Sequence, residues 1–255
     1  MTFSLWQWVA LVLGALLVGV SKSGIPGIGI LSVAIFTNVL EAKASTGLVL
    51  PLLIVGDVVA VATYRQHVRW KHVVRLFPWT AAGVIAGTFA LERIDNRQAK
   101  ILIGVILFLM LALHLWRNRQ AQSVRLEHAV TEHAVWFAPF TGIMAGFTTQ
   151  VANAAGPVMI IYLLAMRLPK MEFLGTGAVF FMLLNWFKVP FMIHLHMITT
   201  DSFIVNCWLA PVVVAGALVG RAVALRIPQK LFERIALALT FIAAAKLVWD
   251  AFGHG

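Results

Sequence analysis

Polar and glycine residues interrupt a long apolar segment near the start of the chain, where Gly19 to Gly29 read GVSKSGIPGIG. An apolar run from about Leu5 to Val20 precedes this break, and a shorter run from Ile28 to Leu40 follows it. Non-helical backbone at membrane depth is tolerated only where protein covers it or where it lines a polar cavity. We therefore expect the break to bind a transported solute, through Ser21, Lys22, Ser23, Gly24, Gly27 and Gly29.

A second break, reading TTQVANAAG, follows another apolar segment. It offers uncharged hydrogen-bonding groups and a glycine, namely Thr148, Thr149, Gln150, Asn153 and Gly156. The short helices expected after the two breaks begin near Pro26 and Pro157, where a missing N–H costs nothing. Free N–H groups and the positive end of a helix dipole favour an anion. The two breaks together predict an anion site without metal or cofactor.

Three charged residues lie in apolar surroundings, and two of them, Asp57 and Lys188, are candidates for charge coupling. Lys22 either compensates the charge of an anion or extends to the cytoplasmic headgroups. Asp57, in LIVGDVVAV, either pairs with a lysine, carries a proton or faces a vestibule. Lys188, in NWFKVPF, either pairs with Asp57 or reaches the membrane interface.

Further polar residues are candidates for lining the solute path: Asn38, Thr46, Thr176 and Asn185. Hydroxyl side chains in membrane helices more often bond their own backbone or pack helices. His194 and His196 are a weak metal signal, because residues two apart do not share a helical face. The sequence contains no nucleophile elbow, P-loop or zinc protease pattern, so we do not expect an enzyme.

The composition indicates an all-α membrane protein. Hydrophobic residues make up 61% of the 255 residues and charged residues 12%, and the mean hydropathy is +0.90. That leaves too little polar sequence to cover a water-soluble globule. The net charge of +10 comes from basic residues in short connections between apolar runs. This distribution indicates contact with lipid headgroups rather than nucleic acid, and the single Cys207 excludes an internal disulfide.

The second half of the chain repeats the first. Pro78, Gly83, Gly87 and Trp116 match Pro211, Gly216, Gly220 and Trp249 at one offset (211 − 78 = 133). Towards the N-terminus the offset shrinks, so that Gly19 and Gly29 match Gly146 and Gly156 (146 − 19 = 127). Chance matching of glycines is the alternative. We assign residues 1–116 to the first repeat, 117–132 to a polar linker and 133–255 to the second repeat.

Each repeat is expected to hold a broken, re-entrant helical hairpin and three transmembrane helices. A single crossing over helix, break and short segment would exceed the roughly 20 residues that a bilayer requires. Each half then crosses the membrane an odd number of times, so the two repeats have inverted topology and their breaks approach each other at the midplane. The positive-inside bias favours this arrangement over four simple crossings per half. The paired glycines four residues apart predict helix packing.

The sequence resembles the TauE/SafE family of sulfite and organosulfonate exporters. The resemblance is carried by GVSKSGIPGIG, by STGLVLPLLIVGD, and by the repeat of this plan from GIMAGFTTQ. It implies a multi-pass carrier of the bacterial inner membrane for small sulfur-containing anions, usually moving them outward. Pro26 within the first glycine cluster and the few glycines of the second break depart from the family pattern.

These observations predict export of sulfite, thiosulfate or an organosulfonate by alternating access. The alternatives are an anion channel, a transporter of another small organic anion and, more remotely, a membrane metalloprotein using His194 and His196. The expected partners are the anionic solute, membrane lipid and a second copy of the chain, and no nucleic acid.

Overall fold

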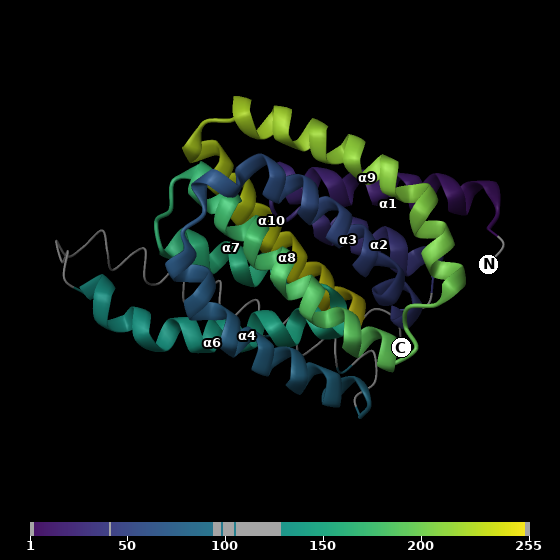
Figure 1. Ribbon diagram of the computed structural model, residues 1–255, viewed down its shortest axis with the longest axis horizontal. Helices are drawn as coiled ribbons and strands as arrows, with labels where there is room; N and C mark the ends of the chain where they lie inside the picture. The colour runs from purple at the N-terminus through teal and green to yellow at the C-terminus, as the bar shows by residue number, and fades with distance from the viewer. Residues whose placement is uncertain (1–2, 41, 94–97, 99–104, 106–128, 253–255) are drawn as a thin grey trace. The chain divides into compact units, whose positions relative to one another are not determined.

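The computed structural model describes residues 3–40, 42–93, 98, 105 and 129–252, and their regular structure is helical throughout (Figure 1). This confirms the all-α prediction. The helices are α1 (Leu5–Ser23), α2 (Gly29–Val39), α3 (Ala42–Tyr64), the 3-10 helix η1 (Arg65–His67), α4 (Trp70–Leu91), α6 (Ala129–Ala152), α7 (Ala155–Ala165), α8 (Lys170–His194), α9 (Thr200–Arg226) and α10 (Gln229–Phe252). The predicted helix over 101–116 and the linker residues 117–128 lie outside the described residues, apart from residue 105.

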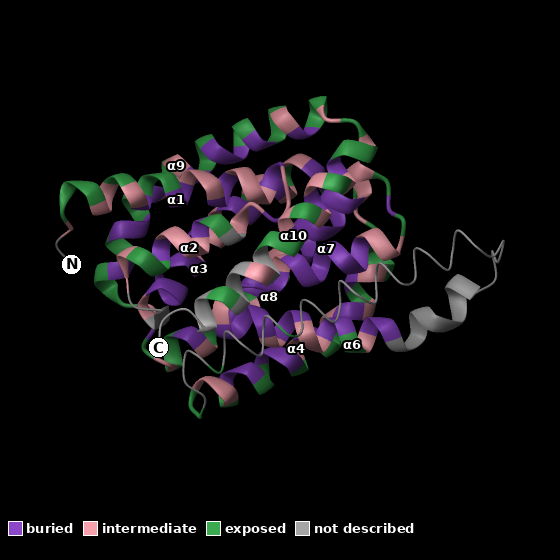
Figure 2. Cartoon of the chain, turned by 180° about the vertical axis from the view of Figure 1, so that it is seen from behind, coloured by how far each residue is buried: buried purple, intermediate pink, exposed green. Residues whose placement is uncertain are grey.

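Five of the described helical segments are long and apolar enough to cross a membrane: Leu5–Ser23, Ala44–His67, Trp70–Leu91, Lys170–His194 and Thr200–Arg226. Their sides that face away from the protein are apolar as well. On α9 the exposed positions include Phe203, Leu218 and Trp208, whose exposed fraction is 73%. Buried and exposed positions alternate along this helix (Figure 2). A large exposed apolar surface of this kind is suited to lipid and not to water.

The chain divides into two compact units, each built from separated parts of the sequence. Unit 1 comprises Met1–Val73 and Pro169–Ala236, and unit 2 comprises Val74–Leu168 and Leu237–Gly255. Unit 1 therefore combines helices from both predicted repeats, with α1, α2 and α3 beside α8 and α9. The first break lies in unit 1 and the second in unit 2.

In unit 1, glycines bring the backbones of α1 and α9 into contact. A Cβ atom on Gly19 would lie 2.0 Å from the carbonyl oxygen of Val213, and one on Gly216 would lie 2.2 Å from that of Leu16. Both distances are far shorter than a van der Waals contact. Glycine is required at this crossing because any side chain would push the two helices apart.

The same contacts recur in unit 2 between α4 and α6. A Cβ atom on Gly146 would lie 2.0 Å from the carbonyl oxygen of Thr80, and one on Gly83 would lie 2.2 Å from that of Ile143. These four residues are the counterparts of the unit 1 residues at the two offsets found in the sequence. The glycines thus pack helices, as predicted. The inverted orientation of the repeats stays a prediction.

Lys170, the first residue of α8, caps the C-terminal end of α9. The Nζ atom of Lys170 donates hydrogen bonds to the carbonyl oxygens of Ala224, at 2.7 Å, and of Ile227. Its backbone N–H donates to Oε1 of Gln229 at 2.7 Å. The last carbonyls of a helix have no partner within it, and a cation also complements the negative end of the helix dipole.

Replacing Lys170 by methionine should therefore lower the free energy of unfolding by about 1–2 kcal/mol, because charged hydrogen bonds to the α9 carbonyls are lost. Thermal denaturation of the purified protein in detergent measures the effect. Lys230→Met is the matched control, because Lys230 is exposed. Equal melting temperatures for the two variants would contradict this assignment.

Candidate functional site

The first break is shorter in the structure than the sequence predicts. Helix α1 continues to Ser23, so Ser21, Lys22 and Ser23 are helical and only residues 24–28 interrupt the helix. The last turn is held by a contact from α3, because the hydroxyl of Tyr64 donates to the carbonyl oxygen of Ser23 at 2.7 Å. Lys22 in this turn also complements the helix dipole. The prediction that these three residues lie in non-helical backbone is wrong.

Glycines shape the turn between α1 and α2. Gly27 has a φ of 97°, a left-handed conformation that residues with a side chain rarely adopt. At Gly29 a Cβ atom would lie 2.8 Å from the Oγ atom of Ser21, and at Gly24 it would lie 2.5 Å from the Cα atom of Gly220. Pro26 lies within this turn and not in the first turn of α2, which begins at Gly29.

Lys22 points into unit 1 and forms an ion pair with Asp57. Its Nζ atom lies 2.7 Å from Oδ1 of Asp57, and the exposed fractions of the two side chains are 10% and 0%. The same Nζ atom lies 4.5 Å from the ring centroid of Phe181 on α8, a cation–π contact. The alternative in which Lys22 extends to the lipid headgroups is therefore wrong.

Two further residues of α8 complete this group. The Nδ2 atom of Asn185 donates to Oδ2 of Asp57 at 2.6 Å. Lys188 is fully buried, and its charge interacts with those of Asp57 and Lys22. Residues 181, 185 and 188 recur at helical spacing and so share one face of α8. We call Lys22, Asp57, Asn185 and Lys188 the charge cluster.

Gly56 gives Lys22 the space to reach the charge cluster. A Cβ atom on Gly56 would lie 2.9 Å from Cγ of Lys22 and 3.3 Å from its Cβ. The glycine directly before Asp57 thus lets the lysine stem pass across α3. Gly56 is not among the residues predicted from the sequence, although a glycine beside a lone aspartate in an apolar helix is a usable signal.

Ser23 follows Lys22 of the charge cluster in the sequence, and its hydroxyl group is buried. Ser23 is 0% exposed, and its Oγ atom has no hydrogen-bond partner among the described residues. Leaving a buried hydroxyl unsatisfied costs about 1–3 kcal/mol. Ser23 can therefore donate a hydrogen bond to a ligand bound at the end of α1.

The second break is also shorter than predicted. Helix α6 includes Thr148, Thr149 and Gln150 and ends at Ala152, and α7 begins at Ala155. Only residues 153 and 154 are non-helical, and Asn153 has a left-handed φ of 51°, which asparagine tolerates better than most residues. Gly156 and Pro157 lie in the first turn of α7, and a Cβ atom on Gly156 would meet nothing within 4 Å.

Within unit 2, the side chain of Gln150 has one atom with a hydrogen-bond partner and one without. Its Nε2 atom donates to Oγ1 of Thr88 at 3.0 Å, while its buried Oε1 atom has no hydrogen-bond partner in the part of the chain that the structure describes. The hydroxyl of Thr148 donates to the carbonyl oxygen of Met144 at 2.8 Å and so bonds its own helix.

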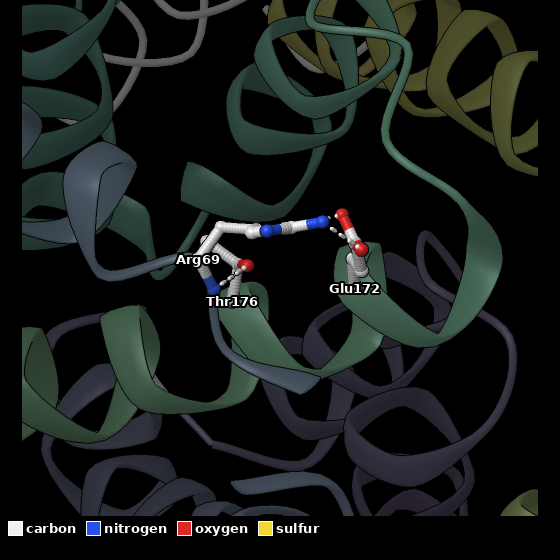
Figure 3. Close-up of polar contacts among 3 residues, drawn as sticks. All are labelled: Arg69, Glu172 and Thr176. Carbon is white, nitrogen blue, oxygen red and sulfur yellow. Dashed lines mark hydrogen bonds and ion pairs between the residues drawn. The ribbon is translucent and has the colours of Figure 1, made fainter. Parts of the chain in front are cut away.

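Two other residues that were candidates for lining the solute path, Thr176 and Asn38, lie elsewhere in the structure. The Oγ1 atom of Thr176 accepts the backbone N–H of Arg69 at 3.0 Å, and the guanidinium of Arg69 pairs with Glu172, with Nε 2.7 Å from Oε2 (Figure 3). Thr176 thus fixes the connection between η1 and α4 to α8. Asn38 is exposed near the end of α2.

His194 and His196 are both exposed around the end of α8. Across the described ranges, no three histidine, cysteine, aspartate or glutamate side chains come together as metal ligands.

One known protein family matches nearly the whole chain. The profile of the sulfite exporter TauE/SafE family matches residues 11–247. The chain belongs to the TauE/SafE family. No curated protein and no solved structure matches it. Together with the five candidate spans, membership of TauE/SafE makes the protein a multi-pass membrane transporter. The matched TauE/SafE range includes both breaks and the whole charge cluster.

Proposed function

We propose that this TauE/SafE protein exports a small sulfur-containing anion, such as sulfite, thiosulfate or an organosulfonate, across the bacterial inner membrane by alternating access. The observation that supports the proposal is the charge cluster, in which the fully buried Lys188 and the largely buried Lys22 accompany the buried carboxylate of Asp57. Charges inside membrane proteins are costly, and they commonly mark the path of a substrate or ion.

The charge cluster favours a negatively charged solute. Asp57 and Lys22 form a direct ion pair, and Lys188 is a second lysine of the same buried group. A cation in a low-dielectric interior is stabilised by an anion beside it. The hydroxyl of Ser23 adds a neutral donor at the end of α1.

Burial of the charge cluster favours a carrier over a channel. Asp57 and Lys188 have no exposed surface, and Lys22 has little. An open pore would leave its polar lining in contact with water, whereas a carrier passes through a closed state. Counterflow in proteoliposomes distinguishes the two. Internal unlabelled sulfite should produce a transient overshoot of radiolabelled sulfite uptake, and a channel would produce none.

Replacing Lys22 by methionine should reduce transport at least about tenfold, because one charged contact to an anion is worth roughly 1.5–3 kcal/mol. Initial rates in proteoliposomes measure this effect, with Lys230→Met as the control. Gln150→Ala tests the second break separately and should also weaken anion binding by purified protein. Wild-type affinity in both the Lys22 and Gln150 variants would remove the breaks from the binding site.

A further inference from the structure

The amide of Gln150 in unit 2 has a hydrogen-bond acceptor that is not used. Its Nε2 atom, on α6, donates to Oγ1 of Thr88 on α4 at 3.0 Å. Thr88 in turn donates its single hydroxyl hydrogen to the carbonyl oxygen of Val84 at 2.9 Å. The amide cannot turn over, because Oε1 would then face a hydroxyl oxygen that has no hydrogen left to donate. Oε1 is therefore the atom without a partner, and an amide oxygen can only accept.

The surroundings of this oxygen make the missing partner costly. Gln150 is 0% exposed, and its Oε1 atom has no hydrogen-bond partner among the described residues. A Cβ atom on Gly87 would lie 2.8 Å from Cβ of Gln150, so the backbone of α4 packs directly against this side chain. A buried acceptor without a partner is destabilising and requires an explanation. A ligand that donates a hydrogen bond provides one.

The first break has an unsatisfied buried group at the matching position. Ser23 on α1 matches Gln150 at the offset found for the glycines of the two breaks (150 − 23 = 127). Ser23 is also 0% exposed, and in the described part of the chain its Oγ atom has no partner. One such group is easily a local accident of packing. The same feature at both copies of one position indicates a shared role.

Helix contacts support the match between the two positions, in each unit by itself. In unit 1, a Cβ atom on Gly220 would lie 2.7 Å from the carbonyl oxygen of Val20, three residues before the serine. In unit 2, a Cβ atom on Gly87 would lie 3.2 Å from the carbonyl oxygen of Phe147, three residues before the glutamine. The serine and the glutamine thus occupy the same place within their own units.

Unit 2 has open space beside its break. A Cβ atom on Gly156, in the first turn of α7, would meet nothing within 4 Å. At the counterpart Gly29 in unit 1, a Cβ atom would lie 2.8 Å from Oγ of Ser21. Thr148, the counterpart of Ser21, instead bonds its own helix. Broken membrane helices bind solutes where their non-helical backbone borders such a space.

We infer that Gln150 accepts a hydrogen bond from the transported anion, so that the substrate is an anion that also carries an O–H or N–H group. The inference rests on the proposed function and narrows its substrate class. Hydrogensulfite and sulfonates with a hydroxyl or amino group meet the requirement, whereas the sulfite dianion, thiosulfate and simple alkanesulfonates do not. The hydroxyl of Ser23 can donate to an oxygen of any of these anions, so the selection depends on Gln150.

The unpaired acceptor gives this selection its direction. An anion without a donor leaves Oε1 of Gln150 unpaired and places its own negatively charged oxygen atoms beside another acceptor. Sites that hydrogen-bond a hydroxyl of their substrate reject the analogue that lacks it, because a buried polar group then stays unpaired. We therefore expect the donor-bearing anion to bind at least about tenfold more tightly than a matched anion without a donor.

Two matched pairs of monovalent anions test the inference, because a methyl group replaces an O–H group in each pair. Hydrogensulfite is compared with methanesulfinate, at a pH low enough to keep sulfite protonated, and isethionate is compared with propane-1-sulfonate. Calorimetric titration of the purified full-length protein in detergent should give at least about tenfold tighter binding for the O–H member of each pair that binds. The charge is equal within a pair, so a difference in affinity reports on the hydrogen bond.

Variants at two positions assign the preference to the amide. Gln150→Met removes the acceptor at similar side-chain size and should bring the two affinities of a pair together. Thr88→Val releases Nε2 and lets the amide turn, so the preference should fall, whereas Thr88→Ser keeps the hydroxyl and should preserve it. This second pair of variants keeps the test where Gln150→Met does not fold. Gln66→Met changes an exposed glutamine and should bind as the wild type does.

The ratio of the two affinities separates selection from a structural role, because a structural defect would change both affinities by the same factor. Wild-type protein that binds the methyl member as tightly as the O–H member would overturn the inference and leave the proposed function intact. Binding of thiosulfate without binding of either O–H member would do the same. A preference that survives Gln150→Met would overturn the assignment to this residue. Protein that binds none of these anions would overturn both the inference and the proposed function.

Discussion

Replacing Asp57 by alanine is expected to lower the free energy of unfolding by about 3–5 kcal/mol, which is the usual cost of removing one partner from a buried ion pair. The variant leaves the ammonium of Lys22 without the carboxylate 2.7 Å away. It also leaves the amide of Asn185 without its acceptor at 2.6 Å. The ammonium of Lys22 then lacks this counter-charge in a largely buried position.

Thermal denaturation in detergent, without substrate anions, measures this loss. Glu172→Ala is the matched control, because it also removes a carboxylate from an ion pair in unit 1. That pair is exposed to solvent and should contribute much less to stability than the buried pair. The double variant Asp57→Ala/Lys22→Met should be more stable than Asp57→Ala alone, because the unpaired ammonium is gone. Equal losses for Asp57→Ala and Glu172→Ala would show that the charge cluster does not stabilise the fold.

The two breaks can be located from the sequence, but each predicted break includes residues that are helical in the structure. Glycines and prolines between apolar runs locate a helix end to within a few residues, and both interruptions lie inside the predicted ranges. The extension of α1 to Ser23 depends on the hydroxyl of Tyr64, which is 41 residues away. Local composition carries no information about such a contact.

The members of the charge cluster can be recognised from the sequence, while the ion pair between Lys22 and Asp57 cannot. A lone aspartate and a lone lysine in apolar helices stand out by type, and they suggest a pair between Asp57 and Lys188 as a hypothesis. The structure joins Asp57 to Lys22 in a close ion pair, because α1 crosses α3 where Gly56 leaves space for the lysine stem. Such a crossing is a property of tertiary packing. Phe181 gave no signal, since phenylalanine is common in apolar helices.

The repeat was the more informative signal for packing. Matching glycines at fixed offsets predicted helix contacts, and the structure shows equivalent backbone approaches in each unit. The partner helices could not be predicted in the same way. Glycine spacing shows that one face of a helix has no side chains to hold a neighbouring helix away. It does not show which other helix packs there.

Gly19→Ala is expected to destabilise the protein by about 3 kcal/mol, at the upper end of the usual cost of overpacking. The added Cβ atom would lie 2.0 Å from the carbonyl oxygen of Val213 and 2.5 Å from the backbone nitrogen of Ala217. A flexible side chain could turn away, but these are backbone atoms within α9. Relief therefore requires α1 and α9 to separate along their contact, which also moves the end of α1 that carries Lys22.

Gly156→Ala is the control for the change in residue type, because its Cβ atom would meet nothing within 4 Å. In the first turn of α7 alanine should be neutral or stabilise by up to about 1 kcal/mol, through its higher helix propensity. Gly146→Ala, the counterpart of Gly19 in unit 2, faces the carbonyl oxygen of Thr80 at 2.0 Å and should be as harmful as Gly19→Ala. Melting temperatures that fall for Gly19→Ala and Gly146→Ala but not for Gly156→Ala would show that both units depend on the same backbone crossing. A fall of similar size in all three would instead trace the effect to glycine's conformational freedom.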